Sequence, residues 1–197
     1  VPSQPVTRRG DVWLLGPHRL LCGDAPSEAD HERVLDGRAV DLVLTDPPYG
    51  VGIDYGVGID VQETFQDTPE RVRTLIGGFM PLVLRWPAVL ITSGIPMMSA
   101  YPPPRWVLAW VVPAGHGSGP WGFTCWNPIL AYGKDPYLAR GLGRYPDAVT
   151  MMATRDPSVE HHPVIKPFQV WRWLLERGTT EPGQIVLDPF AGSGTTI

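Results

Sequence analysis

This 197-residue sequence has few cysteines and no long hydrophobic run, and each scarcity argues against a class of protein. Its two cysteines, Cys22 and Cys125, stand apart without metal-ligand spacing, which speaks against both a zinc site and a disulfide framework. No apolar stretch reaches membrane-spanning length, and the first residues lack the apolar core of a secretory signal. Since an initiator Met is also missing, we expect a trimmed or excised segment. We expect a cytoplasmic protein without a metal or a membrane contact.

The sequence also lacks the excess of positive charge that is common in nucleic-acid-binding proteins, since its net charge is −4. The charges are unevenly divided, with a net −8 over residues 1–70 and a net +4 over residues 71–197. A basic second half could supply a surface that faces phosphates, but scattered, solvated arginines would give the same count. Charge therefore permits a nucleic-acid partner without deciding for one.

Short apolar runs alternate with amphipathic segments along the chain. Strands are expected at residues 18–24, 40–46, 87–92, 105–112, 128–133 and 184–190. Helices are expected from Ser27 to about Gly37 with Asp30 as a capping partner, from Asp67 or Thr68 with Pro69 in the first turn, and from Pro167 to Gly178. Pro81 should kink or end the second helix. This alternation predicts one α/β domain with a mostly parallel sheet and helices on both faces.

The segment LTDPPYG (Leu44–Gly50) ends the second expected strand with a carboxylate, two prolines and an aromatic ring. Prolines have no N–H to donate and keep the backbone extended, so the segment presents a stiff edge of carbonyl groups. Asp46 and Tyr49 flank this edge with a hydrogen-bond acceptor and a flat ring. The segment is suited to hold a planar group that carries an NH₂.

A second motif, VLDPFAGSGTTI, runs from an expected strand into a glycine-rich turn over residues 186–197. Gly192 and Gly194 would let backbone N–H groups approach a ligand, and Asp188 adds a fixed acceptor. A phosphate-binding loop would need a Lys that is missing, and a dinucleotide fingerprint would need a third Gly. The interpretation that remains is a pocket for a zwitterionic nucleoside, S-adenosyl-L-methionine.

Together, DPPYG and DPFAGSGTT resemble the motifs of the amino-group DNA methyltransferases, which act on adenine N6 or cytosine N4. Because Asp188 follows Asp46, the order of the motifs is similar to that of the beta class. Three further segments strengthen the resemblance, which spans about residues 12–197: LLCGDA (20–25), WNPILAYGK (126–134) and HHPVIKP (161–167).

The resemblance implies a Rossmann-like methyltransferase fold with permuted motifs, as a single catalytic domain over residues 1–197. A short target-recognition segment is expected within 113–159. Family members continue past the glycine turn into a helix and a strand, so we expect a C-terminally incomplete fold. We expect Trp106, Trp110, Trp121 and Trp126 near the DNA-facing surface, most of them in the core. The less favoured option is that one of them wedges into a vacated base stack.

The resemblance also assigns roles to residues. The catalytic set is Asp46, Pro47, Pro48 and Tyr49, with DNA as the partner and a homodimer as an option. The set that binds S-adenosyl-L-methionine is Asp24, Ala25, His162, Lys166, Asp188, Pro189, Phe190, Ala191, Gly192, Ser193, Gly194, Thr195 and Thr196. Asp rather than Ser at the start of DPPY favours methylation of adenine N6 in a flipped-out base.

Other functions stay open at this point. Cytosine N4, RNA or a protein amide could be the methylated group, or an incomplete domain could bind DNA or a partner without turnover. A nicotinamide oxidoreductase is disfavoured by the missing third Gly.

Overall fold

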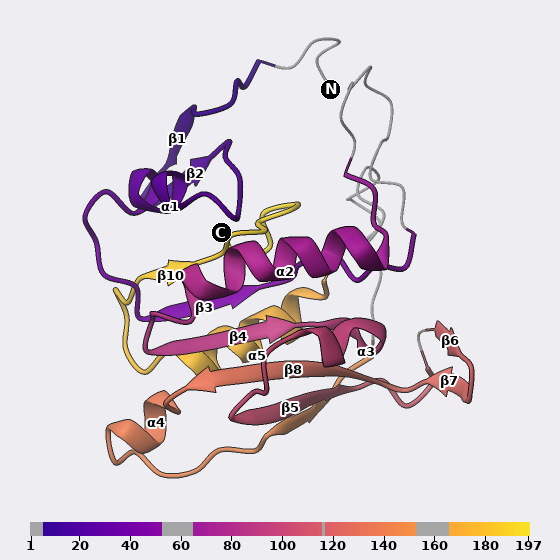
Figure 1. Cartoon of the computed structure of the whole chain (residues 1–197). Coiled ribbons are helices and arrows are strands. Elements are labelled where there is room, and N and C mark those ends of the chain that lie inside the picture. Colours follow the sequence, from indigo (N-terminus) through magenta and orange to yellow (C-terminus); the bar gives the residue numbers. More distant parts are fainter. Residues whose placement is uncertain (1–5, 53–64, 116, 153–165) are drawn as a thin grey trace.

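The computed structural model describes residues 6–52, 65–115, 117–152 and 166–197, and its centre is a six-stranded sheet flanked by helices (Figure 1). The strand order is β10-β3-β4-β8-β5-β9. The sheet consists of β3 (Leu42–Thr45), β4 (Ala88–Thr92), β5 (Trp106–Val111), β8 (Trp126–Gly133), β9 (Ala148–Thr150) and β10 (Val186–Leu187). Outside it lie β1 (Val12–Leu15), β2 (His18–Leu21), β6 (Gly117–Gly119), β7 (Gly122–Thr124), α1 (Glu28–Leu35), α2 (Pro69–Val83), α3 (Gly94–Met97), η1 (Met98–Ala100), α4 (Pro136–Ala139) and α5 (Phe168–Gly178).

The sheet is mostly parallel, as the sequence predicts, and β8 is its one reversed strand. Strand β3 pairs in parallel with both β10 and β4. Strand β8 runs antiparallel to its neighbours β4 and β5, and β5 pairs in parallel with β9. The carboxyl ends of β10, β3, β4 and β5 therefore meet at one edge, which we call the carboxyl edge.

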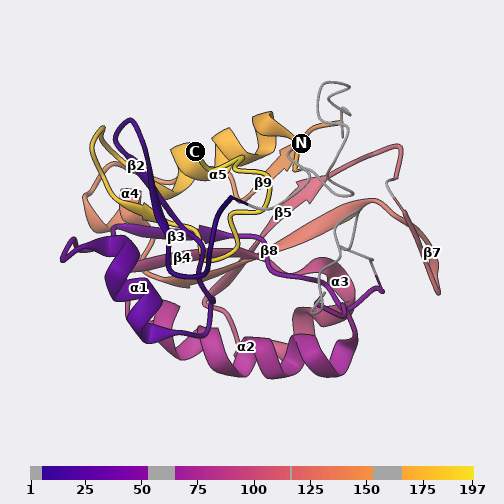
Figure 2. The same cartoon turned by 90° about the horizontal axis from the view of Figure 1, so that it is seen from above.

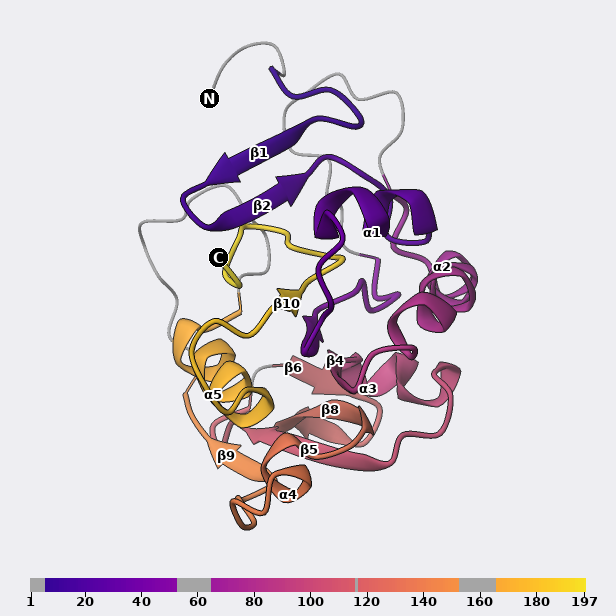
Figure 3. The ribbon, with the colours of Figure 1, turned by 90° about the vertical axis from the view of Figure 1, so that its left-hand side faces the viewer.

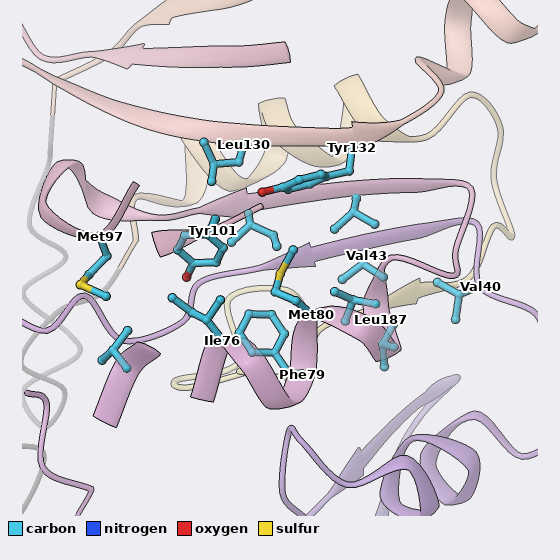
Figure 4. Packing of buried hydrophobic residues seen from close by; sticks show 14 of the residues in the cluster. Val40, Val43, Ile76, Phe79, Met80, Met97, Tyr101, Leu130, Tyr132 and Leu187 are labelled. Carbon is cyan, nitrogen blue, oxygen red and sulfur yellow. The ribbon is translucent and has the colours of Figure 1, made fainter. Parts of the chain in front are cut away.

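Helices cover both faces of the sheet, with α2 on one side and α5 on the other (Figure 2). The face under α2 is sealed by a cluster that includes Val43, Ile76 and Phe79 (Figure 4). The face under α5 is sealed by a second cluster that includes Leu42 and Leu44. Because successive side chains of a strand point to opposite faces, a continuously apolar β3 supplies both clusters.

The strand predicted over residues 18–24 is shorter and lies elsewhere. It ends at Leu21 as β2 and pairs antiparallel with β1, which the sequence analysis missed, in a separate hairpin. The hairpin lies beside α1, and the chain after β10 passes between β10 and the hairpin (Figure 3). The expectation that the strand over residues 18–24 belongs to the main sheet is therefore wrong.

Helix ends follow the predicted caps in part. Ser27 caps α1 by accepting from the Asp30 N–H, whereas the Asp30 carboxylate accepts from the Asp24 N–H rather than closing a capping box. Thr68, not Asp67, caps α2. Pro81 does not stop α2 at once, but the helix ends two residues later, at Val83.

Candidate active site

Asp46 lies directly after β3 at the carboxyl edge, and three side chains hold its carboxylate. The Tyr49 hydroxyl donates to Oδ1 at 2.7 Å, and the buried Thr92 hydroxyl donates to the same oxygen. The Lys166 ammonium lies 2.6 Å from Oδ2. Because the parallel register pairs Thr45 with Ile91, the next residues on the two strands, Asp46 and Thr92, lie side by side. The carboxylate is therefore fixed in orientation.

Lys166 belongs to an ion pair that the sequence analysis did not anticipate. Its side chain and that of Asp46 are 10% and 21% exposed, and its ammonium also lies 4.7 Å from the centre of the Tyr49 ring. Such a cation–ring contact is strengthened by partial burial. The predicted contact of Lys166 with a cofactor carboxylate stays a prediction, and His162 lies outside the described residues.

Tyr49 is wedged against the start of α3. Gly94 has φ +61°, and a Cβ added there would lie 2.9 Å from the Tyr49 ring carbons Cγ and Cδ2. Only a glycine allows this approach without displacing the ring. On the other side of the motif, the buried Asp67 carboxylate accepts from the N–H groups of Gly50 and Val51 at 2.7 and 3.1 Å. Hydrogen bonds therefore hold the last residue of DPPYG, Gly50, as well as the first, Asp46.

Tyr101 is a buried residue near this site that sequence reasoning missed. Burial raises the pKa of its hydroxyl above the ordinary value, and the nearby Tyr49 and Asp46 raise it further. Among the described residues its hydroxyl has no hydrogen-bond partner. Thr92 was missed as well, although its place at the end of a strand expected beside β3 is a usable signal. No local pattern marks Tyr101.

Asp188 connects the glycine-rich turn to the DPPY strand. The Thr45 hydroxyl donates to its Oδ1 at 2.7 Å, and the Phe190 N–H donates to the same oxygen at 3.0 Å. The Thr196 hydroxyl donates to Oδ2 and in turn accepts from the Trp171 indole N–H at 2.8 Å. Burial raises the pKa of Asp188 to about 6, and these hydrogen bonds oppose the rise. Asp188 therefore organises the turn, and its own contact with a cofactor stays a prediction.

The turn itself adopts conformations that glycine favours. Gly192 and Gly194 have φ of +52° and +84°, and the Gly194 N–H donates to the Ala191 carbonyl at 2.8 Å. A Cβ added to Gly194 would meet no atom within 4 Å, so there is open space beside the turn. Pro189 begins the segment, and Ser193 and Thr195 place their hydroxyls 3.3 Å apart.

Asp24 and Ala25 lie on the α2 side of the sheet. Ala25 and Phe190 pack against the same cluster, and the ring of Phe190 makes an edge contact with Phe79 at 5.0 Å. The Ala25 carbonyl is bonded to the buried His31 ring at 2.8 Å. The Asp24 carboxylate is 53% exposed and lies 3.5 Å from Arg9. The two halves of the predicted cofactor site thus share one face of the molecule.

A pocket of about 560 Å³ lies away from these residues. Its walls include Ala88, Trp106 and Gly133, which stand at the start of β4, the start of β5 and the end of β8. It therefore opens at the edge opposite Asp46, and Trp106 is not near the predicted DNA-facing surface. Trp110 is buried in the core. Within the described ranges, no group of His, Cys, Asp or Glu could hold a metal ion, and no helix is long and apolar enough to cross a membrane.

Comparison with known proteins identifies the family of this chain. The DNA methylase family N6_N4_Mtase matches residues 121–197. YubD of Escherichia coli (strain K12), a protein named as a methylase, is 31% identical over 168 residues, which cover 81% of this chain and 70% of YubD.

Two solved structures share the fold. PvuII DNA methyltransferase, described as cytosine-N4-specific, superposes with a TM-score of 0.55 at 15% identity over 88% of this chain and 74% of its own. M1.HpyAVI in complex with SAM gives a TM-score of 0.51 at 19% identity over 80% and 75%. With a DPPY motif and a glycine-rich turn on neighbouring strands of such a fold, this chain belongs to the N6/N4 family of DNA methylases.

Proposed function

We propose that this protein methylates the exocyclic N6 of adenine in DNA, using S-adenosyl-L-methionine as the methyl donor. The observation that carries the proposal is the fixed Asp46 carboxylate. Its neighbour Thr45 donates a hydrogen bond to Asp188, which begins the glycine-rich turn after the adjacent strand β10. Membership of the family supports DNA methylation. Asp rather than Ser at the first position of DPPY supports adenine, through the resemblance described above.

The residues present fit the cofactor. The open space beside Gly194 leaves room for a ligand against the turn, and the exposed Asp24 carboxylate is available as an acceptor. We assign binding of the cofactor to Asp24, Ala25, Lys166, His162 and the segment 188–196. When bound, S-adenosyl-L-methionine supplies an activated methyl group on a sulfonium.

Asp46 and the Pro47 carbonyl prepare the nucleophile. The amino nitrogen of adenine is a poor nucleophile because its lone pair is delocalised into the ring. Two acceptors on its two N–H bonds make it more pyramidal and stabilise the positive charge that develops on it. Tyr49 and Thr92 hold Asp46 in place before the base arrives. Asp46 needs to be only a weak base, because the proton can leave after the methyl transfer.

Lys166 competes with the target base for this position. Its ammonium donates to the Asp46 oxygen and lies over the Tyr49 ring, so it takes both the acceptor and the stacking face that the base would use. Entry of the base therefore requires Lys166 to move aside. Since a duplex hides the adenine amino group, the base must first rotate out of the stack.

The test is mass spectrometry of nucleosides from DNA incubated with the protein and methyl-labelled S-adenosyl-L-methionine. We expect N6-methyladenine, and sequencing of the same DNA locates the methylated site. Detection of N4-methylcytosine instead would identify the protein as a cytosine-N4 methyltransferase, the specificity given for the PvuII enzyme. DNA binding without any methylated base would identify a non-catalytic domain and overturn the proposal. Calorimetric binding of NAD but not of S-adenosyl-L-methionine would also overturn it.

A further inference from the structure

The hairpin of β6 and β7 carries the two most exposed large hydrophobic side chains among the described residues. Trp121 has a relative exposure of 101%, and Phe123 one of 80%. The register pairs Gly117 with Thr124 and Gly119 with Gly122, so Pro120 and Trp121 form the two-residue tip. A fully exposed indole gains nothing from folding, and exposed apolar groups of this kind mark contact surfaces.

The topology places this hairpin at the carboxyl edge, where Asp46 lies. Strand β5 runs in the same direction as β3 and β4, and the hairpin follows its last residue, Val111. Strand β8, which leaves the hairpin, pairs its residue Ile129 with Thr92, the hydroxyl donor to Asp46. The hairpin therefore extends from the same end of the sheet as α3 and the DPPY motif (Figure 1).

The carboxyl edge carries exposed cations, and the hairpin itself carries no carboxylate. No Asp or Glu occurs between residues 113 and 134 of the sequence. Arg71 and Arg73 are exposed at the start of α2, which also begins at this edge, because a Cβ added to Gly50 would lie 3.1 Å from Pro69 Cα. Arg73 has only a weak, exposed contact with Glu70 at 4.0 Å. A phosphate backbone would thus meet cations at α2 and no carboxylate on the hairpin itself.

We propose that the β6–β7 hairpin contacts duplex DNA and that Trp121 stacks into the gap left by the rotated target base. This inference rests on the proposed function. A base that leaves the duplex exposes the faces of its former neighbours, and an aromatic side chain that fills the gap stacks on both. Trp121 suits this role because it lies at the tip of a two-stranded hairpin. Phe123 lies on β7, paired with Ser118 behind the tip, where it can contact the wall of a groove.

The experiment uses two synthetic duplexes that carry the methylated site found by the assay above. In one duplex the target base is paired. In the other it lies opposite an abasic position, so that rotation of the target base out of the duplex breaks no base pair. Four proteins are compared: wild type, Trp121→Ala, Trp121→Phe and the control Trp106→Ala, which removes an exposed tryptophan at the opposite edge. Melting temperature and sedimentation are recorded for each.

We expect Trp121→Ala to lower kcat/KM at least tenfold on the paired duplex and less than threefold on the abasic one. Trp121→Phe and Trp106→Ala should stay within threefold of wild type on both. An equal loss on both duplexes, or no loss, would overturn the wedge role. A change of association state in Trp121→Ala together with an equal loss would overturn it in favour of a self-interface. If wild type methylates no DNA at all, the proposed function fails, and this inference falls with it.

Discussion

Asp46 is the residue on which the proposed chemistry depends, because it is the one carboxylate in a hydrogen-bonded group of four residues. Tyr49 and Thr92 donate to it, and Lys166 neutralises it. A substitution that keeps the shape of the side chain and removes its charge therefore isolates its electrostatic role.

We expect Asp46→Asn to lower turnover at least a hundredfold, which corresponds to about 2.7 kcal/mol in the barrier. Binding of S-adenosyl-L-methionine should stay nearly unchanged, because in the proposed mechanism Asp46 contacts the base and not the cofactor. Single-turnover methylation and calorimetry measure the two effects. The control is Glu32→Gln, the same change at an exposed position of α1. Turnover within tenfold of wild type would contradict the role of Asp46.

Asp188 predicts a pH dependence of stability. Its pKa of about 6, raised by burial from the ordinary 3.8, means that the folded state binds its proton more tightly than the unfolded state. Its stabilising contribution is thus complete below pH 3.8 and is lost as the pH rises through about 6.

We expect the free energy of unfolding of wild type, relative to that of Asp188→Asn, to fall by about 2 kcal/mol between pH 4 and pH 7. Urea unfolding of both proteins at several pH values measures this change. The Asp188→Asn protein should lack this part of the pH dependence, because Asn does not titrate. A difference that is independent of pH, or that grows as the pH rises, would show that the Asp188 carboxyl is not destabilised by burial.

At the scale of elements, the short helix α3 decides how closely the end of β4 can approach the DPPY motif. Gly94 gives this approach, with a positive φ and no room for a Cβ beside the Tyr49 ring. The contact links an element with no catalytic group to the ring on which the base should stack.

We expect Gly94→Ala to destabilise the protein by about 1–3 kcal/mol, because it combines backbone strain with a clash. It should also raise KM for DNA more than it lowers kcat, since Tyr49 would move. The comparison is Gly77→Ala in α2, where an added Cβ meets no atom within 4 Å and the helix should gain stability. Steady-state kinetics and thermal melts distinguish the two. Equal behaviour of both variants would refute the contact.

At the scale of the whole molecule, one packed cluster contacts both Ala25 and Phe190, which belong to the two halves of the predicted cofactor site. Phe79 is fully buried, packs under β3 and touches Phe190 in the glycine turn, so α2 couples the core to the predicted cofactor segment. Stability and cofactor binding should therefore respond together to a cavity in this cluster.

We expect Phe79→Ala to lower the free energy of unfolding by about 3–5 kcal/mol and to weaken binding of S-adenosyl-L-methionine. Leu84→Ala, at a partly exposed position just after α2, should cost far less. Urea unfolding and calorimetry provide the measurements. Normal cofactor affinity in a folded Phe79→Ala protein would show that the turn is positioned without this cluster.

The two motifs, most strand positions and the class of the fold are predictable from sequence, because each depends on local chemistry. Pro47 and Pro48 end a strand wherever it lies, and the apolar run of β3 requires a sheet covered on both faces. Ser27 predicts the start of α1 and Gly178 the end of α5, because helix caps also depend on local chemistry. The short β1, β6, β7 and β9 escape prediction, since three or four residues carry little periodicity.

The amino-acid sequence by itself therefore determined which residues form a strand-ending acidic edge and a glycine-rich turn, and that helices alternate with strands. Only the tertiary structure decided that Lys166 pairs with Asp46 across 120 positions, that Thr45 and Thr196 hold Asp188, and that Tyr101 is buried nearby. The tertiary structure also shows that the strand before Asp24, β2, pairs with β1 outside the main sheet. The physical reason is that pairing between distant segments depends on strand order and register, which are set by the summed burial of the whole core, and no short stretch of sequence contains that sum.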